Sequence, residues 1–282
     1  MSIKMICCDM DGTLLTSKKV IDEVTRLKLI EAQKKGIMVV IASGRNKENL
    51  TFAYKSLHMD KFPNNYIVGI NGQEIYSFKS DEYKLGRVLN SNDANRILES
   101  IHRHGLEGIC FSKHCYYNYL STFNKLVKIA RCIVTKRKYN YGLEGEMSNI
   151  KTIKTHSYKF NHSVNKVVGV QPAFLMKLSF PKIVEELSSD YELLRVAPNW
   201  LEIMPKGVSK GLAIKRIALA NNISSDEIVT FGDGENDISM FEFAKYGIAM
   251  ENAMPTLKDI AYDVTESNDN SGIAKYLEKL GV

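Results

Sequence analysis

Short apolar segments, each followed by a segment with helical periodicity, fill the first and last thirds of this 282-residue sequence. A segment that is apolar on both sides is expected to form a strand that is buried on both faces of its sheet. Such strands alternating with helices are typical of a parallel sheet covered by helices. The sequence therefore predicts an α/β fold, with strands at residues 3–8, 37–43, 66–71, 228–233 and 247–250.

The segments between these strands carry the helical pattern. Val20, Val24, Leu27 and Ile30 recur at spacings of three and four residues, which predicts a helix that buries these side chains and ends near Gly36. By the same reasoning, a further helix is expected over residues 209–221.

The middle of the chain has a different pattern of apolar and polar residues. From about residue 83 to residue 204, aromatic and alternating runs are combined with a few helical segments. Because the α/β pattern resumes afterwards, we interpret this part as a domain inserted into the core. The predicted organisation is a core of residues 1–83 and 205–282, with an inserted α+β cap over residues 84–204.

Composition narrows the class of protein. With 44% hydrophobic and 25% charged residues, the chain is typical of globular proteins. No segment reaches the roughly 20 apolar residues of a membrane-spanning helix, and the start lacks the features of a secretory signal, so we expect a cytoplasmic protein without membrane contact. Five cysteines without Cys-x-x-Cys spacing are interpreted as reduced packing residues.

Positive charge is concentrated between Lys125 and Lys166, where ten lysines and arginines stand against two glutamates. Such a segment can attract anions or bind nucleic acid, although a solvated surface is the more common outcome. No nucleic-acid-binding motif accompanies it, so nucleic acid is not expected as a partner. Nothing in the sequence indicates an obligate protein partner.

Two aspartates follow the first predicted strand. Asp9 and Asp11 are two residues apart, so their side chains can face the same point beyond the carboxyl end of the strand. Ligands bind at this edge of open parallel sheets. Two carboxylates held close together repel each other, and Mg²⁺, which prefers oxygen ligands, would relieve that repulsion.

Other predicted strands end in polar residues at the same edge. The second strand ends at Ser43 and Gly44, which offer a hydroxyl and backbone N–H groups for an anion. A later strand ends in the sequence GDGEND, and a lysine opens the predicted core helix that precedes this strand. These segments bring Asp233, Asn236, Asp237 and Lys210 to the site.

This set of side chains predicts phosphoryl transfer. Asp9 would attack phosphorus, and Asp11 would donate a proton to the leaving alcohol and then activate water. We expect Asp9, the Asp11 carbonyl and Asp233 to hold Mg²⁺. Phosphate oxygens would be bound by Ser43, Gly44, Lys210 and Asn236, while Asp237 would orient Lys210 or a metal-bound water.

The motifs DMDGTL, SGR, SKG and GDGEND resemble, in order and spacing, the four motifs of the haloacid dehalogenase superfamily. The large insertion after the second motif is similar to that of Cof-type phosphatases, the class IIB members with a large α/β cap. The resemblance implies a Rossmann-like core, Mg²⁺ dependence and hydrolysis of small phosphorylated metabolites such as sugar phosphates. Glu251 replaces a residue that is often glycine in the family, which bears on the shape of the neighbouring loop.

Simpler interpretations remain for single residues. An Asp-x-Asp pair also occurs in turns, Ser43 and Asn236 also suit helix N-caps, and Asn71 suits either the site or an ordinary Asn-Gly hairpin. A phosphomutase on the same fold is the alternative enzyme. A nucleic-acid-binding or regulatory protein with a vestigial site is the alternative from another class.

Overall fold

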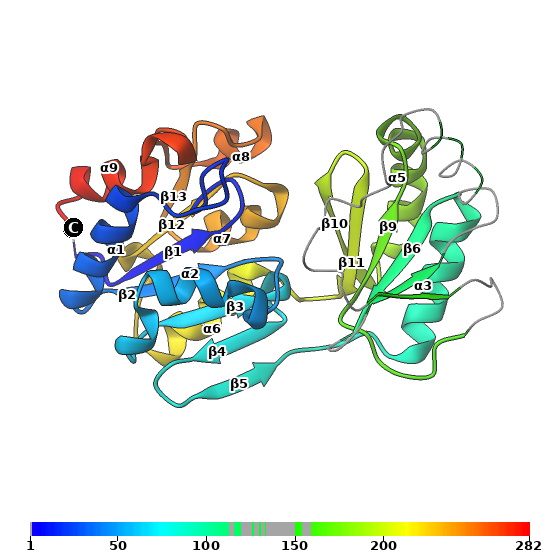
Figure 1. Cartoon of the computed structure of the whole chain (residues 1–282), viewed down its shortest axis with the longest axis horizontal. Helices are drawn as coiled ribbons and strands as arrows, with labels where there is room; N and C mark the ends of the chain where they lie inside the picture. Colours follow the sequence, from blue (N-terminus) through cyan, green and yellow to red (C-terminus); the bar gives the residue numbers. More distant parts are fainter. Residues whose placement is uncertain are drawn as a thin grey trace. The chain divides into compact units, whose positions relative to one another are not determined.

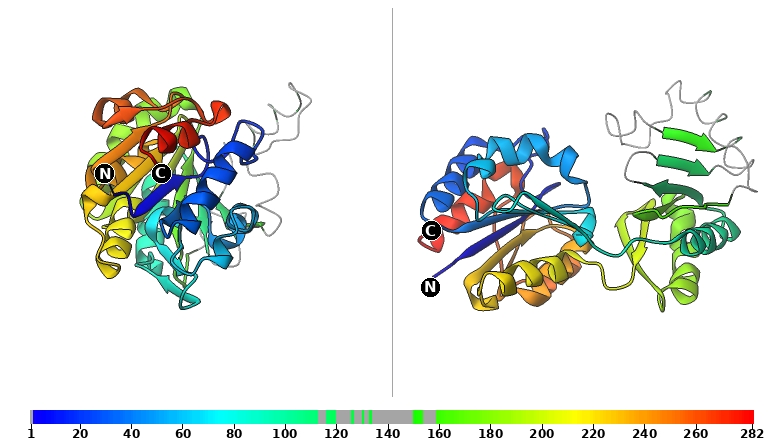
Figure 2. Two further views of the ribbon diagram at one scale, coloured as in Figure 1. Left: turned by 90° about the vertical axis from the view of Figure 1, so that its left-hand side faces the viewer. Right: turned by 90° about the horizontal axis from the view of Figure 1, so that it is seen from below.

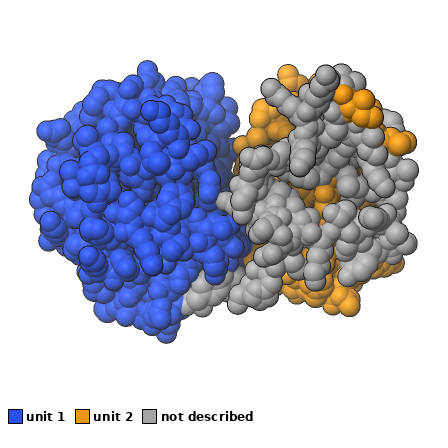
Figure 3. Space-filling model, in the orientation of Figure 1, with its two compact units in different colours: residues 1–86, 207–282 blue, residues 87–206 orange. Residues whose placement is uncertain are grey.

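The structure is a computed structural model that describes residues 2–112, 116–119, 126, 130, 133, 150–153 and 159–282. The chain divides into two compact units, residues 1–86 with 207–282 and residues 87–206 (Figure 3). The first division lies three residues later than predicted, because the strand Glu82–Leu85 completes the sheet of the first unit. The second lies two residues later, because the strand Trp200–Pro205 belongs to the sheet of the second unit.

The first unit contains an eight-stranded sheet with the order β14-β13-β12-β1-β2-β3-β4-β5 (Figure 1). Strands β14 to β3 are parallel, and β4 and β5 are antiparallel to their neighbours. The predicted α/β class is confirmed. The strands are β1 (Met5–Asp9), β2 (Met38–Ala42), β3 (Tyr66–Gly69), β4 (Glu74–Ser77), β5 (Glu82–Leu85), β12 (Ile228–Gly232), β13 (Tyr246–Ala249) and β14 (Asp263–Val264).

Helices cover both faces of this sheet, which is why every residue of β1, β2 and β12 is buried (Figure 2). One face carries α1 (Glu23–Lys34), α2 (Thr51–Ser56) and α9 (Gly272–Lys279), and the other carries α6 (Lys210–Ala220), α7 (Ile238–Phe243) and α8 (Pro255–Ile260). Short 3₁₀ turns complete the unit: η1 (Lys47–Leu50), η2 (Met59–Lys61), η3 (Ile70–Gly72), η4 (Ser225–Glu227), η5 (Glu235–Asp237) and η6 (Asn268–Asn270).

The strand order reverses direction between β1 and β12. From β1 the chain continues to β2 and β3 on one side, whereas β12, β13 and β14 extend on the other side. This is a topological switch point, where the loops that follow neighbouring strands separate and leave a crevice at their carboxyl ends. The fold therefore singles out the ends of β1 and β12 as the place for a site.

Helix α1 is present, but its predicted buried face is wrong. Val20, Val24 and Leu27 are exposed, and the helix begins only at Glu23. The carboxylate of Asp22 caps the helix by accepting a hydrogen bond from the backbone N–H of Thr25. The buried side is formed by Thr25, Leu29, Ile30, Ala32 and Gln33, and Gln33 belongs there because its amide donates to two backbone carbonyls.

The second unit contains a six-stranded sheet with the order β10-β11-β9-β6-β7-β8. All neighbours are antiparallel except β7 and β8. Its elements are β6 (Glu107–Phe111), β7 (Tyr116–Tyr119), β8 (Ile150–Ile153), β9 (Lys166–Val170), β10 (Tyr191–Ala197), β11 (Trp200–Pro205), α3 (Ser91–Arg103) and α5 (Ala173–Leu187). Both helices pack on one face of the sheet, against Cys110, Val167 and Leu201.

Most of the basic segment lies outside the described residues. Of its two ends, Lys125 is not described, whereas Lys166 is buried and paired with Glu202 at 2.6 Å. This lysine is therefore not part of a solvated basic surface. No helix in the described part of the chain is long and apolar enough to cross a membrane.

Candidate active site

Asp9 and Asp233 lie at the ends of the two strands that flank the switch point. Asp9 is the last residue of β1, and Asp233 directly follows β12. The two strands are paired in parallel, with Cys8 opposite Phe231, so they end at nearly the same level. The carboxylates consequently meet above the sheet edge, as the sequence predicts.

Lys210 joins this pair from the other side. The hydroxyl of Ser209 caps α6 by accepting from the N–H of Leu212, which fixes Lys210 as the first helical residue. The Lys210 ammonium donates to Asp9 Oδ1 at 2.5 Å and to Asp237 Oδ1 at 2.7 Å. Burial acts to lower the pKa of Lys210, but the two carboxylates outweigh it and raise that pKa, so the lysine stays charged.

Asp237 connects Lys210 to the turn after β12. It is fully buried, and its second oxygen accepts from the backbone N–H groups of Asp233 and Gly234 at 2.9 and 3.0 Å. Both Asp237 oxygens are therefore engaged within the protein. This geometry suits a residue that holds Lys210 and the Asp233 turn in place better than it suits a metal ligand.

The site carries an excess of buried negative charge. Oxygens of Asp9, Asp233 and Asp237 lie within 4.8 Å of one another, and Lys210 is the cation that contacts two of these carboxylates. Burial and Asp237 raise the pKa of Asp9 well above its ordinary value, and burial raises the pKa of Asp233 to about 6. Within this set, the carboxylate oxygens of Asp9 and Asp233 fit a divalent hard cation such as Mg²⁺.

Gly12 and Thr13 hold the Asp233 carboxylate. The Thr13 hydroxyl donates to Asp233 Oδ1 at 2.7 Å. Gly12 has a φ of +84°, and a Cβ atom on it would lie 2.4 Å from Asp233 Oδ2. The Gly-Thr pair after the two aspartates thus allows a close approach that a larger residue would prevent.

Asp11 is held by two cations. Arg45 donates from Nε to Oδ2 and from Nη2 to Oδ1, each at 2.8 Å, and Lys19 Nζ lies 2.8 Å from Oδ1. Burial acts to raise the pKa of Asp11, but the Arg45 and Lys19 hydrogen bonds hold it below its ordinary value. Both Asp11 oxygens accept hydrogen bonds from cations in this conformation, which favours the ionised carboxylate, so the predicted role of Asp11 as a proton donor requires it to leave these partners and bind a proton.

Ser43, Gly44 and Asn236 are connected through Asn71. Ser43 is buried directly after Ala42, the β2 residue that is paired with Asp9, and its carbonyl accepts from the Asn71 N–H at 2.9 Å. Asn71 Oδ1 accepts from Asn236 Nδ2 at 2.9 Å and would lie 3.2 Å from a Cβ on Gly44. Three separate loops therefore meet at this asparagine.

Asn71 lies in a hairpin and also belongs to the loop cluster, so the structure combines the two interpretations of this residue. The segment is an antiparallel hairpin, with Gly69 opposite Glu74, and it also contributes the buried Asn71 to the loop cluster. Its φ of +52° lies in the left-handed region, which asparagine tolerates better than most residues. The Asn-Gly dipeptide does not distinguish the two interpretations, because it suits a hairpin turn as well as a functional site.

Sequence reasoning missed the side chains of Thr13, Arg45 and Lys19. Thr13 and Arg45 lie inside the motifs DMDGTL and SGR, but neither motif by itself assigns a role to these side chains. Lys19 lies in a loop whose path brings it back to Asp11, and no sequence spacing indicates that return. Charge alone offered a signal, since an arginine one residue beyond Gly44 is a natural partner for a nearby carboxylate.

The cysteines of the core are packing residues. Cys7 and Cys8 in β1 are unpaired and completely buried, and burial raises the pKa of both thiols, which disfavours the reactive thiolate. Cys110 of the second unit is likewise a buried free thiol. The prediction is confirmed for these three residues, whereas Cys115 and Cys132 lie outside the described residues.

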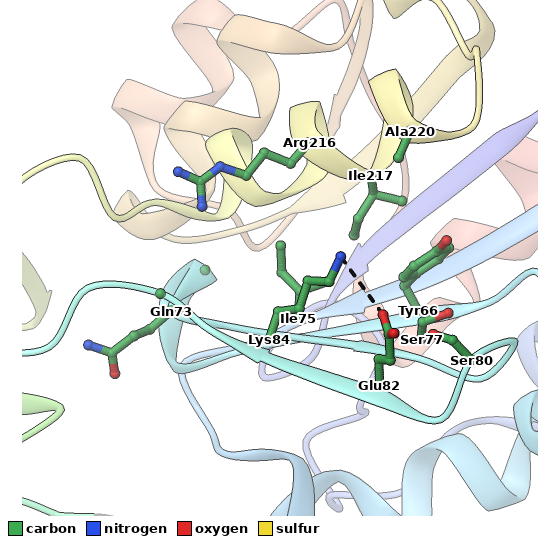
Figure 4. A pocket seen from close by; sticks show the side chains of 12 residues that line it. Tyr66, Gln73, Ile75, Ser77, Ser80, Glu82, Lys84, Arg216, Ile217 and Ala220 are labelled. Atoms are coloured by element: carbon green, nitrogen blue, oxygen red, sulfur yellow. Dashed lines mark ion pairs between the residues drawn. The ribbon is translucent and has the colours of Figure 1, made fainter.

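A cavity of about 300 Å³ lies elsewhere in the first unit, between α6 and the strands β3 to β5 (Figure 4). It is lined by Tyr66, Ile75, Arg216 and Ile217 among others, and by none of the predicted site residues. Glu82 and Lys84 of the edge strand β5 point into it and form an ion pair at 3.9 Å. Both side chains are largely exposed, and charges on an edge strand protect it from pairing with another chain.

The fold and the acid–lysine cluster at its switch point together define an α/β protein with an acidic cluster that could hold a metal ion. The family model for haloacid dehalogenase-like hydrolases matches residues 6–277, and the chain belongs to this family. The resemblance inferred from the four motifs is thereby confirmed.

Individual relatives agree with this assignment. The chain is 31% identical to 5-amino-6-(5-phospho-D-ribitylamino)uracil phosphatase YwtE of Bacillus subtilis, with coverage of 99% of this chain and 98% of that protein. The crystal structure of a haloacid dehalogenase-like hydrolase from Bacteroides thetaiotaomicron has a TM-score of 0.76 at 27% identity and covers 99% and 100% of the two chains. The subclass IIB sugar phosphatase BT4131 shares the fold, with a TM-score of 0.76 at 24% identity and 99% coverage of both chains. The protein is a phosphatase of this family.

Proposed function

We propose that the protein is a Mg²⁺-dependent phosphatase that hydrolyses small phosphorylated metabolites through an aspartyl-phosphate intermediate. The observation that carries this proposal is the convergence of Asp9, Asp233 and Lys210 at the switch point. A carboxylate contacted by a buried lysine and close to a second carboxylate is suited to approach a metal-bound phosphate.

Asp9 acts as the nucleophile. One of its oxygens forms a bond to phosphorus while the ester P–O bond breaks. Asp11, after it has left Arg45 and Lys19 and bound a proton from solvent, donates that proton to the leaving alkoxide. Asp11 then accepts a proton from water, whose oxygen attacks phosphorus and displaces Asp9. The products are an alcohol and inorganic phosphate, and both aspartates return to their starting states.

The remaining residues stabilise charge on the transferring group. Ser43, the backbone N–H groups near Gly44, Asn236 and the Lys210 ammonium bind the phosphoryl oxygens. Asp237 holds Lys210 through the buried ion pair at 2.7 Å.

The carboxylates of Asp9 and Asp233, with the main-chain carbonyl of Asp11, would hold the Mg²⁺ ion. When bound, the ion supplies charge neutralisation, so that the anionic nucleophile and the anionic phosphate can approach each other.

The substrate class rests on the second unit and on the relatives. Relatives are named for phosphatase activity on a phosphorylated ribitylaminouracil and on sugar phosphates. A domain inserted into the core is suited to act as a substrate-selecting cap that excludes water and bulky esters. The expected substrate is accordingly a small phosphate ester in the cytoplasm.

The test is turnover of p-nitrophenyl phosphate with Mg²⁺ by Asp9→Asn and Asp11→Asn. Asp9→Asn should abolish turnover, whereas Asp11→Asn should lower it by roughly 10² to 10⁴, the range for general acid–base catalysis. Full activity of Asp9→Asn would refute the nucleophile assignment. Transfer of the phosphoryl group back to substrate, with no inorganic phosphate released in a single turnover, would instead indicate a phosphomutase.

A further inference from the structure

The loop between β13 and α8 is attached to the turn that carries Asp233. The N–H of Met250 donates to the Gly232 carbonyl at 3.1 Å, and the N–H of Met254 donates to the Asp233 carbonyl at 2.9 Å. Both ends of this loop are therefore held on the main chain at the end of β12. Asn252 lies between these two anchor points.

Asn252 connects this loop to the loop that follows β1. Its Nδ2 donates to the Gly12 carbonyl at 2.7 Å. Gly12 lies between Asp11, whose carbonyl is a proposed Mg²⁺ ligand, and Thr13, whose hydroxyl donates to the Asp233 carboxylate. A shift of Gly12 would consequently displace both of its neighbours.

Asn268, in the turn η6, fixes the orientation of the Asn252 carboxamide. The Asn268 N–H donates to Asn252 Oδ1 at 3.2 Å, and Asn268 Nδ2 donates to the Leu15 carbonyl at 2.7 Å. With its oxygen engaged by this N–H, the Asn252 amide points its Nδ2 toward the Gly12 carbonyl. The two asparagines together hold the loop after β1 at Gly12 and at Leu15.

The proposed metal ligands come from two different loops, so the spacing of these loops bears on metal binding. Thr13 also joins them, but its hydrogen bond uses Oδ1 of Asp233, an oxygen of the carboxylate that would bind the ion. The Asn252 hydrogen bond uses a main-chain carbonyl outside the ligand set, so it does not compete with the ion. Residues that orient metal ligands without contacting the ion contribute substantially to metal affinity.

We propose that Asn252 and Asn268 are positioning residues that set the Mg²⁺ affinity of the site. Asn252 holds the Gly12 carbonyl at a fixed distance from the Asp233 turn, and Asn268 keeps the Asn252 carboxamide in the orientation that this requires. Both act on the ligands through the main chain and not by binding the ion themselves. The inference rests on the proposed function, since it assumes the metal ligands named there.

The direct test is titration calorimetry of the metal-free protein with Mg²⁺ at pH 7.5. Asn252→Ala should raise the Kd about tenfold, the lower end of the range for residues that orient metal ligands, because water can replace an exposed amide at the Gly12 carbonyl. Asn252→Ala/Asn268→Ala should bind within about twofold of Asn252→Ala, because the two residues act through one carboxamide. Effects that multiply in full would refute the role of Asn268.

Asn64→Ala is the matched control. Asn64 is an exposed asparagine in the turn before β3, at the amino ends of the parallel strands and therefore at the opposite edge of the sheet from the site. This variant should bind Mg²⁺ with wild-type affinity. Equal affinities of Asn252→Ala and Asn64→Ala would overturn the proposal.

A second readout separates positioning from a general structural role. The Tm of metal-free Asn252→Ala should lie within about 2 °C of wild type, as expected of an exposed side chain. With p-nitrophenyl phosphate, the Mg²⁺ concentration at half-maximal rate should rise about tenfold, whereas kcat at saturating Mg²⁺ should stay within about twofold of wild type. A low kcat that Mg²⁺ does not restore, or a large fall in the metal-free Tm, would refute the positioning role.

Asp233→Asn distinguishes failure of this inference from failure of the proposed function. If this variant binds Mg²⁺ as tightly as wild type, the proposed metal site is wrong, and the inference is wrong with it. If Asp233→Asn loses Mg²⁺ binding while Asn252→Ala retains wild-type affinity, the metal site stands and only the positioning role of Asn252 is refuted.

Discussion

Replacement of Lys210 by methionine is predicted to destabilise the first unit strongly. Lys210 and Asp237 are fully buried and Asp9 nearly so, with the ammonium shared between the two carboxylates. Methionine preserves most of the side-chain volume but leaves both carboxylates without their shared cation. Removing one partner from a buried ion pair typically costs about 3–5 kcal/mol in the free energy of unfolding.

The expected loss is large enough to measure by thermal unfolding. For a unit of roughly 150 to 250 residues, 1 kcal/mol lowers Tm by about 2–4 °C, so Lys210→Met should lower the Tm of this unit by about 6–20 °C without Mg²⁺. The loss should be greater at pH 8 than at pH 5, because carboxyl groups with a raised native pKa stabilise the fold when protonated and lose that stabilisation as pH rises. Added Mg²⁺ should restore part of the difference, since it replaces the missing positive charge.

Two further variants make the measurement specific. Lys215→Met, an exposed lysine on the same helix, is the matched control and should change Tm by no more than about 1 °C. Lys210→Met/Asp237→Asn should be more stable than Lys210→Met alone, because it removes one of the two unpaired carboxylates. If the Tm of Lys210→Met equals that of Lys215→Met at pH 8, the buried charge cluster does not exist as described.

The remaining predictions concern the Asp233 carboxylate. Gly12→Ala should weaken Mg²⁺ binding at least tenfold and lower the free energy of unfolding by about 1–3 kcal/mol, because the new methyl group overlaps Asp233 Oδ2 and the residue keeps a positive φ. Calorimetry measures the affinity, and urea unfolding measures the stability. Unchanged values would contradict the close contact. Because the pKa of Asp233 is about 6 instead of 3.8, Mg²⁺ must displace a proton at low pH, so affinity at pH 5 should be roughly tenfold lower than at pH 7.5. The same shift makes the metal-free protein lose stability as pH rises from about 4 to 6, and a pH-independent affinity would argue against Asp233 as a ligand.

The sequence predicted the ends of the strands better than the faces of the helices. Asp9, Ser43 and Asp233 lie at the ends of short runs that are apolar on both sides, a pattern typical of buried parallel strands. Helix α1 shows the contrast, because Val20, Val24 and Leu27 have helical spacing yet are exposed. A helix can satisfy its backbone hydrogen bonds in any rotation, so the buried side depends on the cap at Asp22 and on partners such as the carbonyls that accept from Gln33.

Charge relationships across the site were only partly accessible from sequence. The order of the motifs indicates that Asp9, Asp233 and Lys210 belong to one site, since parallel strands deliver their carboxyl ends to a common edge. Which charged side chains pair with each other depends on the distances between loops in the folded protein. The Arg45 and Lys19 clamp on Asp11 follows from two loop paths, one of them with Lys19 in a left-handed conformation, and no periodicity encodes such paths.

The amino-acid sequence by itself determined the α/β class, the insertion of a second domain and the residue types of the site, because these depend on local patterns of burial and on spacing along each strand. Three features were decided only by the tertiary structure. Both oxygens of Asp237 accept hydrogen bonds, one from Lys210 and the other from the turn at Asp233. Asn71 links three loops, and Asp11 lies between two cations. The physical reason is that a hydrogen bond or ion pair between side chains forms only within about 3 Å, and the folding of distant loops sets that distance.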